Sequence, residues 1–185
     1  MGLFSILFEP PDPELVVREH GPMVHRHLKR IFGPQADTDD AFQMVFIEVL
    51  RSLPSFRGQA KLSTWIRRIT WNVAYQEMRS QYRRPKIVSF EDDGHGDDLD
   101  AESEAATHEA LGHLYTGLEN LDPKQRMAVV MHDIEGQTLK EISQALGRPL
   151  QTVASQLRAG RSQLCAWMRG DALVEIDNKH EEVSS

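Results

Sequence analysis

The chain has 185 residues, of which 40% are hydrophobic and 26% charged, and its net charge is −7 at pH 7. This length allows one sizeable domain or two small ones, and the composition is that of a globular protein. The single cysteine, Cys165, excludes an internal disulfide, and no apolar run approaches the roughly 20 residues that span a bilayer, so we expect a cytoplasmic protein without membrane insertion.

The first part of the chain is predicted to form a small helical domain. Apolar residues recur at helical spacing, and no stretch shows the sustained alternation of a β-strand, so the fold class is expected to be all-α. Helices are expected over 13–32, from Thr38 to just before Pro54, and over 63–83, each followed by a glycine or a proline. They make up a domain over 11–86, preceded by a flexible arm over 1–10.

Each of these helices has an apolar stripe that we expect to line a shared core. In the first helix the stripe is Leu15, Val16, Val24, Leu28 and Ile31. In the second it is Ala41, Val45 and Val49, with Phe42 and Phe46 beside them. In the third it is Leu62, Ile66, Ile69 and Val73.

The opposite side of the third helix carries aromatic and cationic side chains. These are Trp71, Tyr75, Arg68 and Arg79, with Trp65 and Asn72 flanking them. Exposed rings can stack on unpaired bases while arginines follow the phosphates, as single-stranded nucleic acid requires. The alternative is that Trp71 and Tyr75 pack on the first helix. Nine lysines and arginines against one acid between 51 and 86 favour nucleic acid.

An acidic segment separates this domain from a second one. Residues 91–109 contain nine acids and no lysine or arginine, and residues 87–107 are predicted to be a solvated, flexible linker. The second helical domain is expected over 108–170, and an acidic tail over 171–185 follows it. Between 137 and 170 there are five bases and one acid, so both domains are locally cationic although the whole chain is acidic.

Capping signals place the helices of the second domain. Asp122-Pro123 with Gln125 predicts a capping box at the start of a helix that stops at Gly136. Thr138 and Glu141 predict another capping box, and Gly147 stands just past the end of that helix. A last helix is expected over 150–168. The residues expected to face inward are Met127, Val130, Met131, Ile134, Leu139, Ile142, Leu146, Val153, Leu157 and Leu164.

Residues 138–164 have the spacing of a helix-turn-helix, with a short capped helix, a turn and a longer helix. In such a unit the second helix enters the major groove, with its N-terminal residues against base edges. Two helices and a turn also occur in helical proteins without a role on DNA, and the local excess of bases favours DNA. The outward-pointing residues of the second helix are Gln151, Thr152, Ser155, Gln156 and Arg158, whose polar groups suit base edges.

The two modules together resemble bacterial RNA polymerase sigma factors of the extracytoplasmic-function type. In the first module the resemblance is carried by DDAFQMVF (39–46), LPSFRG (53–58) and LSTWIRRITWNVA (62–74). In the second it is carried by LENLDPKQRMAVVMHDIEGQTLKEISQALG (118–147) and PLQTVASQLRAGRSQL (149–164). It covers about 11–86 and 108–168, which is most of the chain.

The resemblance implies a role for each surface. Asp40 and Gln43 would dock on the clamp helices of the polymerase β′ subunit, although Met44 stands where the family often has glutamate. The loop 56–61 and Asn72 would capture a flipped base of the promoter −10 element, at a cost of a few kcal/mol for unstacking. The residues assigned to the −10 element are Phe56, Arg57, Lys61, Trp65, Arg68, Trp71, Asn72, Tyr75 and Arg79. Those assigned to the −35 element are Gln151, Thr152, Ser155, Gln156, Arg158 and Arg161.

The resemblance also implies partners and one departure. The partners are core RNA polymerase (β′ clamp helices and β flap), promoter DNA and an anti-sigma factor, and the linker would follow a path toward the RNA exit channel. Ala154, Gln156 and Ala159 stand where relatives often carry basic side chains, so binding to the −35 element is expected to be weaker and less salt-sensitive than usual.

Other functions find less support in the residues. A dimeric helix-turn-helix regulator of operator DNA is the main alternative, and size in solution separates it from a sigma factor, which we expect to be a monomer when free. His20, His25 and His27 lack an evident further ligand, so no metal or other cofactor is expected. A small hydrolase that uses these histidines would require a metal, and no catalytic set of residues is evident, so we do not expect an enzyme.

Overall fold

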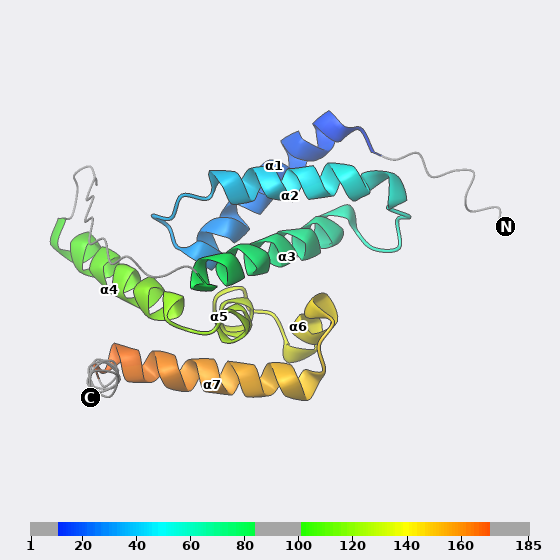
Figure 1. The fold of residues 1–185 in the computed structure, drawn as a ribbon. Helices are drawn as coiled ribbons and strands as arrows, with labels where there is room; N and C mark the ends of the chain where they lie inside the picture. Colours follow the sequence, from blue (N-terminus) through cyan, green and yellow to red (C-terminus); the bar gives the residue numbers. More distant parts are fainter. Residues whose placement is uncertain (1–10, 84–100, 171–185) are drawn as a thin grey trace.

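The computed structural model describes residues 11–83 and 101–170, with side chains described from Thr107 onward in the second range, and within these ranges the regular structure is helical (Figure 1). The predicted all-α fold class is confirmed. The helices are α1 (Pro13–Phe32), α2 (Asp39–Ser52), α3 (Leu62–Arg83), α4 (Ala101–Glu119), α5 (Pro123–Val129), α6 (Leu139–Leu146) and α7 (Leu150–Met168). A 3-10 turn (Leu53–Ser55) follows α2, and a π-helical turn (Val130–Ile134), called the π turn below, follows α5.

Helices α1, α2 and α3 form the first unit and pack against one another. Local signals set their ends: Asp12 caps α1 by accepting a hydrogen bond from the amide of Glu14 at 2.9 Å, and Pro54 lies in the 3-10 turn where α2 ends. The predicted stripes of α1 and α2 are buried, with Phe42 half-buried, except that Leu15 is exposed.

The predicted core stripe of α3 is confirmed as core-facing, because Ile66 lies in the core and Leu62, Ile69 and Val73 pack against it, but the buried surface of the helix extends further round than predicted. Of its four members only Ile66 is fully buried, while Leu62, Ile69 and Val73 are half-buried. The buried residues of α3 are Ile66, Thr70, Trp71, Ala74 and Met78. Thr70 and Ala74 are small, and the Thr70 hydroxyl donates to the Ile66 carbonyl at 3.0 Å, so a polar residue is satisfied within its own helix and can be buried. A stripe of large apolar residues therefore marks only one edge of the covered surface of α3.

Helices α4 to α7 form the second unit, in which α5 and α7 pack closely and α6 closes the helix-turn-helix. Thr138 and Glu141 form the predicted capping box, and Gly147 follows α6 with a φ of 62°, a left-handed conformation that glycine adopts without strain. The predicted capping box at Asp122 is wrong: Asp122 caps α5 by accepting from the Lys124 amide, but the side-chain oxygen of Gln125 has no hydrogen-bond partner among the described residues.

Helix α4 begins at Ala101, so the end of the predicted linker (87–107) is helical. Alanine and glutamate, which recur between 101 and 106, are strong helix formers, and the prediction weighed the acidic charge and the lack of large apolar residues rather than this helix propensity. The predicted arm (1–10), the acidic tail (171–185) and linker residues 87–100 lie outside the described residues.

The two units pack against each other, a contact that the sequence motifs do not predict. Helix α3 lies beside α5 and α6 (Figure 1), and α1 contacts the π turn. Helix α3 therefore lies between the rest of the first unit and the second unit, with covered surface on more than one side.

Candidate nucleic-acid interface

The start of α3 and the loop before it form one polar surface with an aromatic base. Phe56 is buried, and its ring centroid lies 5.0 Å from that of Trp65, which is half-buried. Arg57 is exposed and donates through Nη1 to the Pro54 carbonyl at 2.9 Å, which fixes the loop. Lys61, Arg68, Asn72 and Arg79 are all exposed. The structure thus presents an exposed amide and several exposed cations along α3 and the loop before it, with the Phe56–Trp65 ring pair at the start of the helix.

The predicted exposed position of Trp71 is wrong. Its side chain is 4% exposed and belongs to the core, and the indole Nε1 has no hydrogen-bond partner among the described residues. The prediction assumed that α3 has one covered side, but α1 and α2 contact it as well as α5 and α6. Tyr75 is half-buried, and the Arg148 guanidinium lies 4.8 Å from its ring centroid. In this arrangement neither ring is free to stack on a base.

Helix α7 presents a polar face along its N-terminal half. Val153 and Leu157 are buried and fix the rotation of the helix. As predicted, its outer side is then polar, and the exposed residues are Gln151, Thr152, Ser155 and Arg158. This is the face that a helix-turn-helix inserts into the major groove.

Two further residues assigned to the −35 element make hydrogen bonds to other side chains of the protein. Gln156 is half-buried and accepts a hydrogen bond from Arg148 Nη1 at 3.3 Å. Arg161 is exposed but donates through Nε to Asp133 Oδ2 at 2.9 Å. The hydrogen bond from Arg161 lowers the pKa of the Asp133 carboxyl, and the same contact raises the pKa of Arg161.

The outer face of α2 is more apolar than the two residues singled out from the sequence suggested. Asp40 and Gln43 are exposed, and Met44 and Ile47 on the same helix are 53% and 57% exposed, with Leu50 also exposed. A helix packed on one side only normally places such residues inside, so this face has the character of a docking surface. The sequence held the signal, because Met44, Ile47 and Leu50 lie opposite the buried Ala41, Val45 and Val49.

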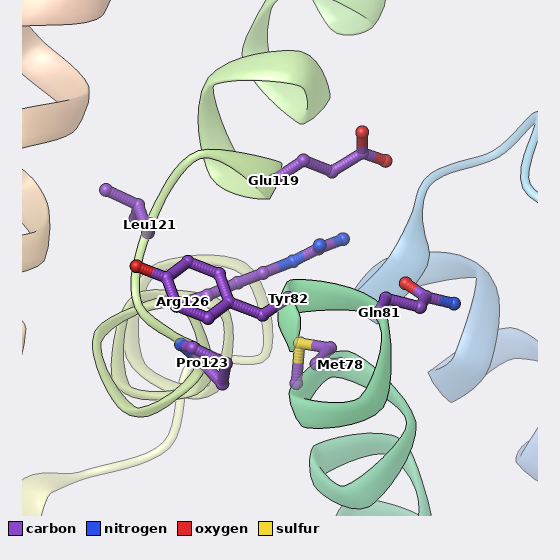
Figure 2. A pocket seen from close by; sticks show the side chains of 7 residues that line it. All are labelled: Met78, Gln81, Tyr82, Glu119, Leu121, Pro123 and Arg126. Carbon is purple, nitrogen blue, oxygen red and sulfur yellow. The ribbon is translucent and has the colours of Figure 1, made fainter. Parts of the chain in front are cut away.

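A small cavity lies between the end of α3 and the α4–α5 connection (Figure 2). Its volume is about 200 Å³, and residues of both units line it. Figure 2 shows the Arg126 side chain extending away from α5, past Tyr82 of α3. Arg126 is buried between the units, and this burial lowers the pKa of its guanidinium.

Of the three histidines singled out from the sequence, His27 is buried, His20 is half-buried and His25 is exposed. Among residues 11–83 and 107–170, no three His, Cys, Asp or Glu side chains gather as metal ligands would. His27 instead lies beside Glu135, as described below. Across the described helices, none combines the length and the apolar character required to cross a bilayer.

Comparisons with known proteins match both units. The family model for sigma-70 region 2 matches residues 16–84, and that for sigma-70 region 4 matches residues 112–164. The chain is 30% identical over 161 residues to the RNA polymerase sigma factor SigZ of Bacillus subtilis, covering 85% of this chain and 87% of that protein. It is 35% identical over 156 residues to the ECF RNA polymerase sigma factor SigE of Mycolicibacterium smegmatis, covering 83% of this chain but only 60% of that protein.

Solved structures show the same fold. CnrH in complex with the cytosolic domain of CnrY aligns with a TM-score of 0.57 and 21% identity, over 86% of this chain and 88% of that one. The sigma factor RpoE of Bartonella quintana, in complex with the anti-sigma factor NepR, aligns with a TM-score of 0.57 and 18% identity, over 84% and 96%. With the two family models on its two units and these relatives along most of its length, the chain belongs to the sigma-70 family of RNA polymerase sigma factors, as a member of the extracytoplasmic-function type.

Proposed function

We propose that this chain binds core RNA polymerase and directs it to promoters whose −35 and −10 elements are read by the second and first units. The observation that carries the proposal is the face of α7, where the buried Val153 and Leu157 leave Gln151, Thr152, Ser155 and Arg158 exposed together. Amides, hydroxyls and a guanidinium on one exposed helix face are groups that read base edges.

The −10 element would be bound along the first half of α3 and the loop before it. There Asn72 offers an amide for the edge of an unpaired base, and Arg57, Lys61 and Arg68 offer charge for phosphates. The aromatic surface left for stacking is that of Trp65, supported by Phe56, because Trp71 is buried. Stacking is worth about 1–3 kcal/mol per base, which offsets much of the cost of unstacking one base.

The exposed face of α2 would dock on the polymerase. Met44 and Ile47 supply apolar area, while Asp40 and Gln43 supply polar contacts at its edge. Apolar centres with polar rims are the usual anatomy of protein interfaces. The chain itself would make or break no covalent bond. It would bind the opened DNA strand while the polymerase performs the chemistry, and both proteins would act in the cytoplasm.

An anti-sigma factor is proposed as a further partner. Both solved structures named above are complexes, one with the cytosolic domain of CnrY and one with the anti-sigma factor NepR. A protein of that kind would prevent access to core polymerase by covering surfaces such as the α2 face.

Run-off transcription with purified core polymerase tests the function. Addition of this chain should stimulate transcription from promoters of the extracytoplasmic-function type, and the free protein should be monomeric. No stimulation from any such promoter, without an inhibitor present, contradicts the proposal. A free dimer that binds palindromic DNA without polymerase would favour an operator-binding regulator instead.

Asn72→Ala tests the base pocket. Promoter opening, followed by permanganate reactivity of unpaired thymines, should fall about 10-fold or more, as expected for loss of a polar contact to a flipped base, while duplex binding is retained. Gln76→Ala, an exposed amide one turn further along α3, is the matched control. Equal loss of opening and of duplex binding in Asn72→Ala would contradict the assignment.

A further inference from the structure

We propose that three side chains of the second unit, Tyr115, Arg126 and Glu135, form a latch on the last turns of α1 that keeps the sigma factor closed. The proposal rests on the proposed function and concerns its regulation. In the closed arrangement Arg148 covers Tyr75 on α3, and Gln156 is held by Arg148. Release of the latch would have to come before the two units occupy separate sites on polymerase and promoter.

The first part of the latch acts on the carbonyls at the end of α1. The last carbonyls of a helix have no partner within the helix. Here the Tyr115 hydroxyl donates to the Arg30 carbonyl at 2.9 Å, and Arg126 Nη2 donates to the Ile31 carbonyl at 3.1 Å. Arg126 is 4% exposed, and its positive charge lies at the negative end of the α1 dipole. The second unit thus supplies two donors that α1 lacks.

The second part of the latch is a buried carboxylate. The Glu135 side chain is 2% exposed, with Oε2 2.7 Å from His27 Nδ1 and Oε1 3.7 Å from Arg30 Nη1. A buried carboxylate is costly without cationic or hydrogen-bonding partners, and both of these partners come from α1. If the units separate, Glu135 loses both of them. The contact is therefore specific to the closed arrangement.

The π turn links this latch to the recognition helix. The Glu135 amide donates to the Val130 carbonyl at 2.9 Å, five residues back, rather than four as in an α-helix. With this winding, Glu135 contacts α1 while Asp133, two residues earlier, holds Arg161 of α7. One short segment thus holds α1 on one side and a residue assigned to the −35 element on the other. Such π turns are often found at functional sites.

Closure has a measurable consequence for binding. When only a fraction of molecules is open, the apparent Kd for a partner that binds the open form is the intrinsic Kd divided by that fraction. Weakening the latch should therefore expand the free protein and tighten its binding to core polymerase. It should do so without any change in the surfaces that contact the polymerase.

The test uses the full chain with the double substitution Tyr115→Phe and Glu135→Gln, which keeps side-chain shape but removes one hydroxyl and one charge. Glu109→Gln, an exposed acid on α4, is the matched control. Small-angle X-ray scattering should show a larger radius of gyration for the double variant than for the wild type and the control. Its apparent Kd for core polymerase should be about tenfold lower, the effect of losing a buried charge-assisted contact from the closed form alone.

Identical scattering and identical Kd in wild type and double variant overturn the latch. Circular dichroism establishes that the variant is folded; if it is not, Arg148→Gln, which releases Tyr75 from the second unit, replaces it with the same expected direction. Run-off transcription separates the two proposals. If the wild type stimulates transcription but the variants neither expand nor bind more tightly, the latch fails and the function stands. If the variants expand but no chain stimulates transcription, the function fails and with it the regulatory role.

Discussion

A methyl group added at Gly160 tests the packing that positions the recognition helix. Gly160 lies on α7 where this helix meets α5. A Cβ at this position would lie 2.8 Å from Val129 Cγ2 and 3.2 Å from both Cβ and the backbone oxygen of Gln125. Valine is stiff about its first side-chain torsion and a helix carbonyl cannot move alone, so α5 and α7 must separate to accept the methyl group.

The size of the effect follows from two opposing terms. Overpacking of a core costs about 1–3 kcal/mol, and these contacts place Gly160→Ala in the upper half of that range. Alanine regains about 1 kcal/mol over glycine in a helix interior. We therefore expect Gly160→Ala to lower the free energy of unfolding by about 1–2 kcal/mol.

Urea unfolding followed by circular dichroism measures this change, with an unchanged slope expected because the surface exposed on unfolding is the same. Gly112→Ala is the matched control: Gly112 lies within α4, and a Cβ there meets nothing within 4 Å. The control should be more stable than the wild type by about 1 kcal/mol, from helix propensity alone. A Gly160→Ala protein as stable as this control would refute the close approach of α5 and α7.

Two further predictions concern the second unit. Thr138→Ala removes the hydroxyl that accepts from the Glu141 amide at 3.3 Å, and it should lower the free energy of unfolding, measured in urea, by about 1 kcal/mol. Gln144→Ala, on the exposed side of α6, is the control and should leave the free energy of unfolding within about 0.5 kcal/mol of the wild type. Equal values for the two variants would count against the capping box. The pKa of Asp133 is lowered from its usual 3.8, so the stabilisation from its contact with Arg161 is complete above that pH and is lost as the pH falls through the lower folded pKa. Wild type should therefore exceed Asp133→Asn in unfolding free energy at neutral pH, by a margin that disappears in acid; a margin that grew on acidification would show the opposite sign.

The ends of most helices could be predicted because the signals that set them are local. Asp12 and the Gly33-Pro34 pair bound α1, and the Thr138–Glu141 capping box and Gly147 bound α6, each through atoms a few residues apart. The outer face of α7 could likewise be predicted from the inward positions of Val153 and Leu157, without knowledge of the neighbouring helices. The misplaced linker boundary at Ala101 arose within the same local information, from giving charge more weight than helix propensity.

The burial of α3 could not be obtained in this way, because it depends on residues far away in the chain. Trp71 and Tyr75 have the same helical periodicity whether one side of α3 is covered or two. Only the position of α5 and α6 against α3 decides whether these two side chains are covered. The exposed apolar face of α2 was present in the sequence as Met44 and Ile47, but its exposure required knowing that no described helix covers it.

By itself, the sequence determined the helices, the capped helix-turn-helix and the membership of a family, since these depend on neighbouring residues and on collinear motifs. The tertiary structure alone decided that the two units close on each other, that Trp71 is buried, and that Glu135 and Arg126 reach the end of α1. The physical reason is range. A cap or a stripe is satisfied within one or two turns of helix, whereas a buried charge must find its partners wherever the fold brings them, here about a hundred residues away.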